Sequence, residues 1–273
     1  PALLALVGRV LAHAPVLADA LAQRAELLDG LIDARALDLP GGVAEIAREL
    51  GGDAPDYERL LDRVRERVGE HRFALGVQLI EGAHDPLDIA EGYARVAEAA
   101  IAVLVPAAIA EFAAAHGKVA GSDLVILALG RLGGGALTYA SDLDLVFLFS
   151  GDHGAESDGR RPLGATQYYN KLSQRIVAAL SVATAAGPLY EVDTRLRPNG
   201  TQGLLAVSLD SFARYQREAA WTWEHLALTR ARIVLGDAGP AQAVITEILQ
   251  APRDAAVLRT DVLAMRGDID AAK

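Results

Sequence analysis

The chain has 273 residues with a formal net charge of −10, and this acidic balance argues against a broad nucleic-acid-binding surface. It contains no cysteine, which excludes disulfides, thiolate metal sites and a cysteine nucleophile and fits a reducing cytoplasm. Because 52% of the residues are hydrophobic and 5% are aromatic, the sequence predicts a globular protein with a mostly aliphatic core.

The first 117 residues show helical spacing of apolar residues and no strand-like alternation. The expected helices are Leu3 to Ala12, one that begins near Pro15, Val43 to Leu50, Tyr57 to Leu79 with Asp56 as N-cap, and one from Asp85-Pro86 to His116-Gly117. Within the last helix, the apolar run from Ala99 to Ala110 is shorter than the roughly 20 residues that span a bilayer. We therefore expect a buried core helix, which Pro106 should kink or split.

A glycine-rich turn between two short apolar runs follows this helical region. Val125 to Leu129 and Leu145 to Phe149 have the length and composition of buried strands. The glycines between them are Gly130, Gly133, Gly134 and Gly135. Glycine permits positive φ and lets the backbone approach an anion closely, so this turn is a candidate phosphate site.

Asp142 and Asp144 stand two residues apart at the head of the second strand, so both carboxylates should project from one face. Two converging acids repel unless a cation lies between them. Mg²⁺ prefers one or two carboxylates together with phosphate oxygens of a substrate. The pair beside the glycine turn therefore predicts a site for Mg²⁺, expected as two ions, and a nucleotide.

The remaining chain reads as a polar loop, further strands and helices. We expect a solvated loop over Gly151 to Gly164 and then a helix over Ala165 to Ala185, which Gly187-Pro188 stops. Strands are expected at Leu189 to Leu196 and Leu204 to Val207, with a turn at Asn199-Gly200 between them. A helix capped by Ser208 or Asp210 should carry Trp221 and Trp223, and the chain should be helical from Asp237 to its end. The start at Pro1 and the end within a helical pattern indicate a fragment of a longer protein.

Asp193 lies on the third predicted strand, where alternation places Glu191, Asp193 and Arg195 on one face. If this strand neighbours the second one, Asp193 joins the first two acids. Three carboxylates suit nucleotidyl transfer with two metal ions, in which one acid can also take the proton of the nucleophile. The alternative is that these acids only form ion pairs with Arg195 or Arg197.

Several basic and aromatic residues have two readings each. Arg195 and Arg197 can contact phosphates as bidentate forks or can balance the acidic cluster. Arg131 and Lys171 are weaker phosphate candidates, because exposed basic residues are common. Trp221 and Trp223 are expected to be packing residues, with an aromatic shelf for a base or a partner as the alternative.

Two common phosphate motifs are absent. There is no G-x-x-x-x-G-K-[ST], and the glycines do not spell G-x-G-x-x-G. The acidic pair also comes at the start of the next strand, where a dinucleotide fold would carry one ribose-binding acid at its end. These observations disfavour a Walker-type site and dehydrogenase chemistry.

Three long segments carry a resemblance to a known family. They read LGRLGGGALTYASDLDLVFLF, YEVDTRLRPNGTQGLL and SLDSFARYQREAAWTWEHLALTRARIVLGD, and they closely resemble the glutamine synthetase adenylyltransferase family. Members have two related halves, one that attaches AMP to glutamine synthetase and one that removes it by phosphorolysis. The segment Tyr190 to Gly203 and the string Ala220 to His225 resemble the attaching, C-terminal half.

The resemblance implies an α+β nucleotidyltransferase fold of the polymerase-β-like type, with a small mixed sheet preceded and followed by helical segments. From the pattern along the chain we expect a helical lead-in over 1–117, a catalytic domain over 118–235 and C-terminal helices over 236–273. Asp142, Asp144 and Asp193 match the acids that bind metal, and Gly133 and Gly134 match the triphosphate loop. We add Gly130, Arg131, Ser141, Arg195 and Arg197 as nucleotide or phosphate contacts.

The implied reaction transfers AMP from MgATP to a tyrosine hydroxyl of glutamine synthetase and releases pyrophosphate. The resemblance also implies regulation by glutamine and the PII signalling protein, in the cytoplasm, without nucleic-acid or membrane partners. Arg131 stands where lysine is commoner in the family, and Ala136 replaces a usual acid, so a role for position 136 is in doubt. The alternatives are the deadenylylating paralogue, which releases ADP, and a silent regulatory module.

Overall fold

The computed structural model describes residues 2–31, 38–252 and 254–271, which form two compact units that interleave along the chain. Unit 1 contains Pro1–Ala108, Gly135–Asp142 and Val177–Glu191. Unit 2 contains Ile109–Gly134, Leu143–Ile176 and Val192–Lys273. The division of the sequence at residues 117 and 235 stays a prediction. Each unit is described by itself below.

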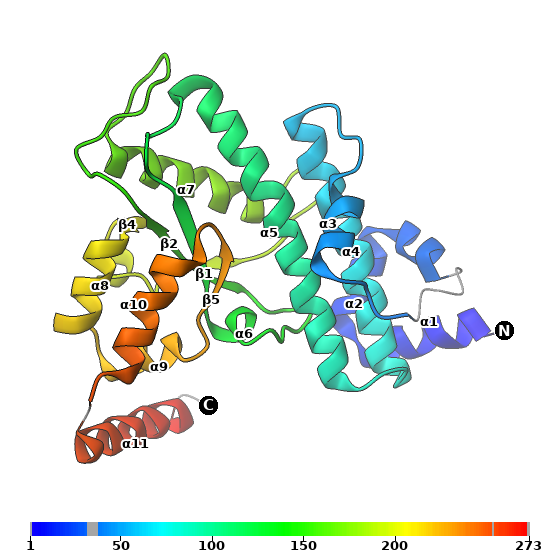
Figure 1. Cartoon of the computed structure of the whole chain (residues 1–273). Helices are drawn as coiled ribbons and strands as arrows, with labels where there is room; N and C mark the ends of the chain where they lie inside the picture. The colour runs from blue at the N-terminus through cyan, green and yellow to red at the C-terminus, as the bar shows by residue number, and fades with distance from the viewer. Residues whose placement is uncertain (1, 32–37, 253, 272–273) are drawn as a thin grey trace. The chain divides into compact units, whose positions relative to one another are not determined.

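Unit 1 is helical, as its sequence predicts (Figure 1). Its helices are α1 (Ala2–His13), α2 (Pro15–Gln23), the 3₁₀ helix η1 (Ala25–Leu31), α3 (Val43–Gly51), α4 (Tyr57–Glu81) and α5 (Pro86–His116), of which α5 continues into unit 2. Asp56 caps α4, because its carboxylate accepts a hydrogen bond of 2.8 Å from the Arg59 N–H. The predicted split at Pro106 is wrong, since α5 runs through this residue.

The long helix α5 is rich in apolar residues. By length and composition it could cross a membrane, with a mean hydropathy of 1.9 over its best window, of which 50% is buried in the protein. Helices α1 and α2 pass the same test only as a pair bent by 117°. Because core helices pass it as well, this is weak evidence for a span. Ile101, Leu104 and Val105 are fully buried, as expected of a core helix.

Unit 2 is built on a mixed five-stranded sheet. Its strands are β1 (Leu124–Ala128), β2 (Leu143–Phe149), β3 (Val192–Asp193), β4 (Ala206–Ser208) and β5 (Arg232–Leu235). Strand β1 pairs antiparallel with β2 and with β5. Strands β3 and β4 both pair parallel with β2, first at its start and then at its end. The fold is therefore α+β, and β2 is its central strand.

Three of these strands differ from the sequence expectation. The third predicted strand, Leu189 to Leu196, shrinks to the two residues of β3, because only these pair with β2. The fourth is shifted to Ala206–Ser208. Strand β5 was not predicted, since its short run lies between two helical patterns and gains its strand conformation from pairing with β1.

Helices cover both faces of the sheet (Figure 1). On one face, Val146 and Leu148 of β2 pack in a buried cluster with residues of α8 (Leu209–Glu218), α9 (Thr222–Leu228) and α10 (Ala238–Gln250). On the other face, Phe149 stacks on Tyr169 of α7 (Ala165–Ser181) with ring centroids 4.7 Å apart. Because side chains alternate along β2, Asp144 lies on the face of Val146.

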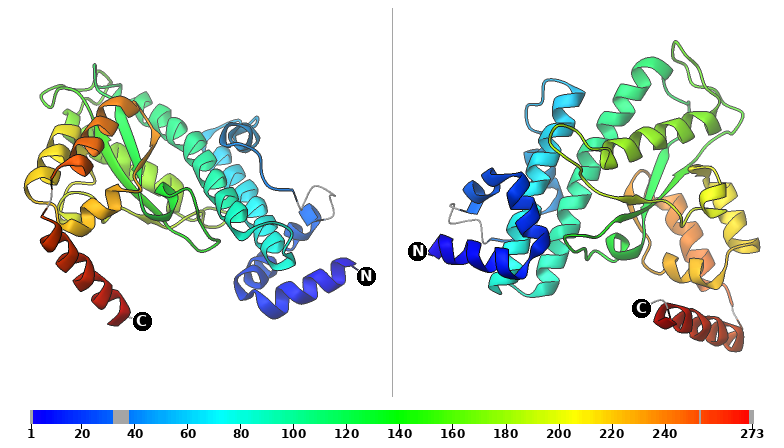
Figure 2. Two further views of the ribbon diagram at one scale, coloured as in Figure 1. Left: turned by 60° about the horizontal axis from the view of Figure 1, so that its bottom comes forward. Right: turned by 180° about the vertical axis from the view of Figure 1, so that it is seen from behind.

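The tryptophan segment differs from its prediction. Ser208 caps α8, but this helix ends at Glu218, and Trp221 is the N-cap of the separate helix α9. Trp221 is 70% exposed and Trp223 41% exposed, so the expectation that they are packing residues is wrong. The last helix, α11 (Ala255–Ala271), lies beside α9 and away from the sheet (Figure 2), and Thr222 donates a hydrogen bond to Asp261. The predicted helical residues 272–273 lie outside the described residues.

Tyr190 is a buried polar residue in the short segment of unit 1 that leads to β3. Its side chain is 7% exposed, and among the described residues its hydroxyl has no hydrogen-bond partner. Burial raises the pKa of Tyr190 to about 12, since the phenolate would lose its hydration, while nearby Arg72 opposes the shift.

We expect Tyr190→Phe to preserve stability at pH 7 and to protect the protein in alkali. The unfolded chain ionises this tyrosine near pH 10, whereas the folded chain retains the proton until about pH 12. The wild type should therefore lose stability across this window, by up to about 1.4 kcal/mol per pH unit, and the variant should lack this contribution. Urea midpoints at pH 7, 10 and 11 test this. An identical pH dependence for both proteins contradicts it.

Candidate metal and nucleotide site

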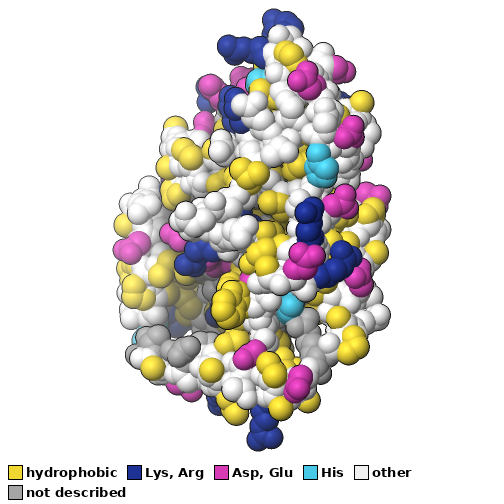
Figure 3. Space-filling model, turned by 90° about the vertical axis from the view of Figure 1, so that its left-hand side faces the viewer, with side chains coloured by type: hydrophobic (Ala, Val, Ile, Leu, Met, Phe, Trp, Pro, Cys, Tyr) yellow, Lys and Arg dark blue, Asp and Glu magenta, His cyan; other side chains and the backbone are white. Residues whose placement is uncertain are grey.

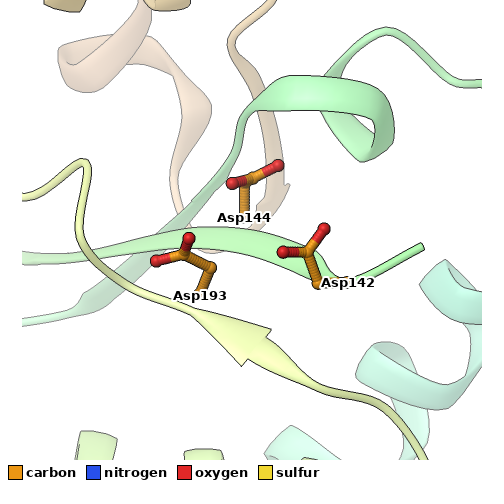
Figure 4. Close-up of side chains that lie close together, drawn as sticks. All are labelled: Asp142, Asp144 and Asp193. Carbon is orange, nitrogen blue, oxygen red and sulfur yellow. The ribbon is translucent and has the colours of Figure 1, made fainter. Parts of the chain in front are cut away.

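Three aspartates converge where β2 begins (Figure 4). Asp142 directly precedes β2, and Asp144 is its second residue. Asp193 lies opposite Asp144 in the parallel register of β3 and β2. One carboxylate oxygen from each aspartate lies within 4.8 Å of the other two. The structure thus brings together the three acids that the strand periodicity predicted, while their roles stay predictions.

The donor set fits a small divalent cation. All three groups are carboxylates, which magnesium prefers, and Asp144 and Asp193 are partly buried. With Mg–O distances of about 2.1 Å, two oxygens on opposite sides of one ion lie about 4.2 Å apart. The three oxygens lie within 4.8 Å of one another, which is compatible with this value.

The glycine turn folds over Asp144. Residues Gly130–Gly133 form the short helix α6, and Gly130 has a φ of +53°. A Cβ atom on Gly130 would collide with the carboxylate of Asp144. The Leu129 N–H also donates a hydrogen bond of 2.9 Å to the Asp144 carbonyl. Glycine at 130 is therefore needed both for the backbone angle and for the space that the carboxylate occupies.

Gly133 and Gly134 allow close packing in the turn, but their backbone N–H groups are not free to bind a ligand. The Gly133 N–H donates to the Leu129 carbonyl at 2.7 Å, and the Gly134 N–H donates to the Gly130 carbonyl at 3.2 Å. A Cβ on Gly133 would collide with the Arg230 carbonyl and would lie 2.7 Å from the Ala128 carbonyl. Their amides are thus engaged inside the turn, and the missing side chains allow the close packing.

Arg232 of strand β5 and the preceding Arg230 contact the glycine turn, and neither contact was predicted from the sequence. Arg232 donates from Nε to the Gly133 carbonyl at 3.1 Å and from Nη2 to the Leu132 carbonyl at 2.8 Å. The backbone of Arg230 packs against Gly133. The run Arg232-Ile233-Val234-Leu235 contains β-branched residues, and this signal could have identified the strand.

Arg195 forms an ion pair with the third acid. Its Nε lies 2.8 Å and its Nη2 2.5 Å from Oδ2 of Asp193, and its backbone N–H donates to Oδ1 at 2.8 Å. These bonds lower the pKa of Asp193, so its carboxylate is held in the charged form. The Arg195 side chain is 75% exposed, and exposed pairs are weak. Asp193 is therefore both a member of the acidic cluster and the ion-pair partner of Arg195, and its role as a metal ligand stays a prediction.

The other candidate residues either make local contacts within the chain or are exposed to solvent. Arg197 donates to the carbonyl and the hydroxyl of Thr194, at 2.7 and 2.9 Å, and so braces its own loop. The Ser141 hydroxyl accepts a hydrogen bond of 3.0 Å from the Thr138 N–H and closes the turn before Asp142. Arg131 on α6 and Lys171 on α7 are exposed.

The surface charges agree with the composition. On the face drawn in Figure 3, basic and acidic side chains are interspersed, and the described part of that face shows no continuous basic area. The chain carries 36 acidic against 26 basic residues. Neither observation favours a nucleic-acid backbone as the ligand.

Comparisons with known proteins place the chain in context. A family model described as glutamate-ammonia ligase adenylyltransferase matches residues 4–247. The chain is 42% identical over 281 residues to a protein of Mesorhizobium japonicum, 42% over 287 to one of Rhizobium meliloti and 41% over 280 to one of Agrobacterium fabrum. Each is named bifunctional glutamine synthetase adenylyltransferase/adenylyl-removing enzyme. The matches cover 100% of this chain, which spans only 28% of the length of these relatives.

We expect Gly130→Ala to disrupt the acidic cluster. The added methyl group must displace the Asp144 carboxylate, and alanine is strained at a φ of +53°. Mn²⁺, measured as a spectroscopic substitute for Mg²⁺ by the electron paramagnetic resonance of the free ion, should bind at least about tenfold more weakly, the usual effect of disturbing a metal ligand's surroundings.

Gly164→Ala is the matched control, because this glycine has open space around its Cβ position and no positive φ. It should bind Mn²⁺ like the wild type. Unchanged Mn²⁺ affinity in a folded Gly130→Ala protein would show that Asp144 is not positioned by this turn.

Proposed function

The chain belongs to the glutamate–ammonia ligase adenylyltransferase family, and from this premise we propose that it transfers AMP from MgATP to a tyrosine hydroxyl of glutamine synthetase. Pyrophosphate is the second product. In this proposal the sheet of unit 2 is a nucleotidyltransferase fold of the polymerase-β-like type. The small mixed sheet with flanking helices is consistent with that fold.

The convergence of Asp142, Asp144 and Asp193 beside the glycine turn carries this proposal. Three carboxylates within 4.8 Å repel one another, so the arrangement is costly unless cations bind to it. A triphosphate brings both the cations and further negative charge to the same place. The family relationship supplies the reaction class, and the acids supply the place where it would occur.

The residues have distinct tasks in the proposed reaction. Asp142 and Asp144 would hold Mg²⁺, which when bound neutralises phosphate charge and lowers the pKa of a coordinated hydroxyl. A tyrosine hydroxyl has an ordinary pKa near 10, so its proton must be removed near neutrality, and in this proposal Asp193 accepts it. The phenolic oxygen forms a bond to the α-phosphorus of ATP. The bond from that phosphorus to the β-phosphate oxygen breaks, and pyrophosphate leaves.

Arg195 is the proposed phosphate contact nearest the acids. Its guanidinium now neutralises Asp193, and its exposed side chain can turn to a triphosphate once a cation takes over that task. The weaker candidates for phosphate binding are Arg131, Ser141 and Arg197. The side chains of Ser141 and Arg197 bond to their own loops, and that of Arg131 faces solvent. Gly130, Gly133 and Gly134 are retained as members of the proposed phosphate-binding turn, whose close packing depends on their missing side chains.

The direction of the reaction is part of the proposal. The relatives are named for both adenylyl transfer and adenylyl removal, and the chain covers 28% of their length. The string around Trp221 and Trp223 resembles the attaching half, which favours transfer to glutamine synthetase. The second candidate is removal of AMP by phosphorolysis, which would give ADP.

The wider setting is proposed on the same basis. We propose that glutamine and the PII signalling protein regulate the activity, that the protein works in the cytoplasm, and that it has neither nucleic-acid nor membrane partners. The catalytic segment is proposed to be residues 118–235, with helical segments on either side. These points follow from the family resemblance and the composition.

The decisive experiment is incubation of the chain with labelled ATP, Mg²⁺ and unmodified glutamine synthetase. We expect AMP to appear on glutamine synthetase, and Asp142→Asn or Asp144→Asn to reduce the rate by at least about 100-fold, since each acid supports both alignment and charge stabilisation. Labelled protein separated by gel electrophoresis measures this.

Asp210→Asn is the matched control, because it makes the same charge change at a carboxylate with 87% exposure. It should label glutamine synthetase at the wild-type rate. If no AMP is transferred, the same proteins are supplied with adenylylated glutamine synthetase and phosphate. Release of ADP that depends on Asp142 would establish the removing activity instead.

A further inference from the structure

Arg72, on the helix α4 of unit 1, holds a position between two tyrosine rings. Its guanidinium carbon lies 4.6 Å from the ring centroid of Tyr139 and 5.0 Å from that of Tyr190. Both distances are within the range of cation–π contacts. The aromatic contact extends to Tyr93, whose ring meets that of Tyr139 edge-on at 6.4 Å. The Tyr93 hydroxyl in turn donates to the Arg72 carbonyl at 3.1 Å.

The same guanidinium donates hydrogen bonds to two separate segments of the chain. Nη1 donates to the Leu189 carbonyl at 2.9 Å, and Nη2 donates to the Tyr139 carbonyl. Tyr139 stands three residues before Asp142, and Leu189 stands four residues before Asp193. Arg72 therefore joins the backbone segments that lead directly into two of the three acids. These two segments and Arg72 all belong to unit 1.

The contacts of Arg72 indicate a geometric task. Among the residues that the structure describes, Arg72 has no carboxylate partner, and its two bonds go to carbonyl oxygens. A guanidinium is a planar fork whose donors have fixed directions, and it keeps two acceptors at a set separation. A flexible side chain with one donor group cannot do this.

We propose that Arg72 is a positioning residue that sets the separation of Asp142 and Asp193 around the metal. This rests on the proposed function of the acidic cluster. Mg²⁺ requires near-ideal octahedral geometry, and displacements of about 1 Å at a reacting centre can reduce rates 100-fold. β3 has only two residues, so a restraint on the segment that leads into it can add to the pairing with β2. Arg72 thus acts through the backbone segments that it holds, without contacting the substrate.

Arg65 provides a matched comparison on the same helix. It is 2% exposed and donates to the carbonyls of Leu61, Ala179 and Val182, each at 2.9 Å or less. Like Arg72, it donates to backbone carbonyls, but it braces the end of α7. Arg65 is buried, whereas Arg72 is half-buried. The nearest of its acceptors along the chain stands 11 residues before Asp193. Its loss should weaken unit 1 without moving the acids.

The test compares Arg72→Lys and Arg72→Gln with Arg65→Lys in the whole chain. Arg72, Tyr139 and Tyr190 line a cavity of about 1080 Å³, so water can replace the missing guanidinium and the variants should fold. Mn²⁺ affinity is measured on the protein without nucleotide, well below the melting temperature, and circular dichroism gives the melting temperature. The Asp142→Asn variant gives the background Mn²⁺ affinity of a protein in which the acidic cluster is disrupted.

We expect both Arg72 variants to bind Mn²⁺ about 10–100-fold more weakly, as is usual when the groups that orient metal ligands are lost. Arg65→Lys should lower the melting temperature while its Mn²⁺ affinity stays within about twofold of the wild type. In the transfer assay, Arg72→Lys should lower kcat and leave the KM for glutamine synthetase unchanged. This split distinguishes positioning from a general loss of stability.

Three results would overturn the proposal. They are wild-type Mn²⁺ affinity in folded Arg72 variants, an equal loss of affinity in Arg65→Lys, and an Arg72→Gln protein that alone unfolds while Arg72→Lys binds Mn²⁺ normally. A wild type without Asp142-dependent Mn²⁺ binding would instead show that the proposed metal site is wrong, and the positioning role would fall with it.

Discussion

The repulsion among three carboxylates is the constraint on which the rest of the structure depends. The carboxylate oxygens of Asp142, Asp144 and Asp193 lie within 4.8 Å of one another. The three charged groups would separate if the backbone that carries them were free to move. Asp144 and Asp193 are each restrained by the surrounding structure. The pairing of β3 with β2 fixes Asp193 opposite Asp144, and the glycine turn covers Asp144. Arg195 meanwhile supplies one positive charge to the cluster.

The sequence predicted the centre of the site because its signals are local. The two apolar runs bracket the glycine turn, and strand alternation placed Asp142 and Asp144 on one face. The same alternation allowed Asp193 to join them, which the parallel register achieves. The glycines were expected to offer amides to phosphate, whereas the amides of Gly133 and Gly134 bond within the turn.

The features that the sequence did not reveal depend on contacts between distant parts of the chain. Strand β5 forms because β1 offers it an edge, and Arg232 reaches the glycine turn only through this pairing. Trp221 and Trp223 have the composition of a core segment, but the chain turns between α8 and α9 and exposes them. Arg72 looked like one charge on an amphipathic helix. Its partners at Tyr139 and Leu189 lie 67 and 117 residues away.

The exposed tryptophans have an optical consequence. The chain contains two tryptophans, and both lie at the start of α9, separated by a single residue. α9 is followed by Arg230 and Arg232, which pack on the glycine turn. The intrinsic fluorescence of the protein therefore originates from one place, a solvent-facing position one short helix away from that turn. A change in tryptophan emission during a ligand titration would therefore report on the start of α9, and no extrinsic label is needed.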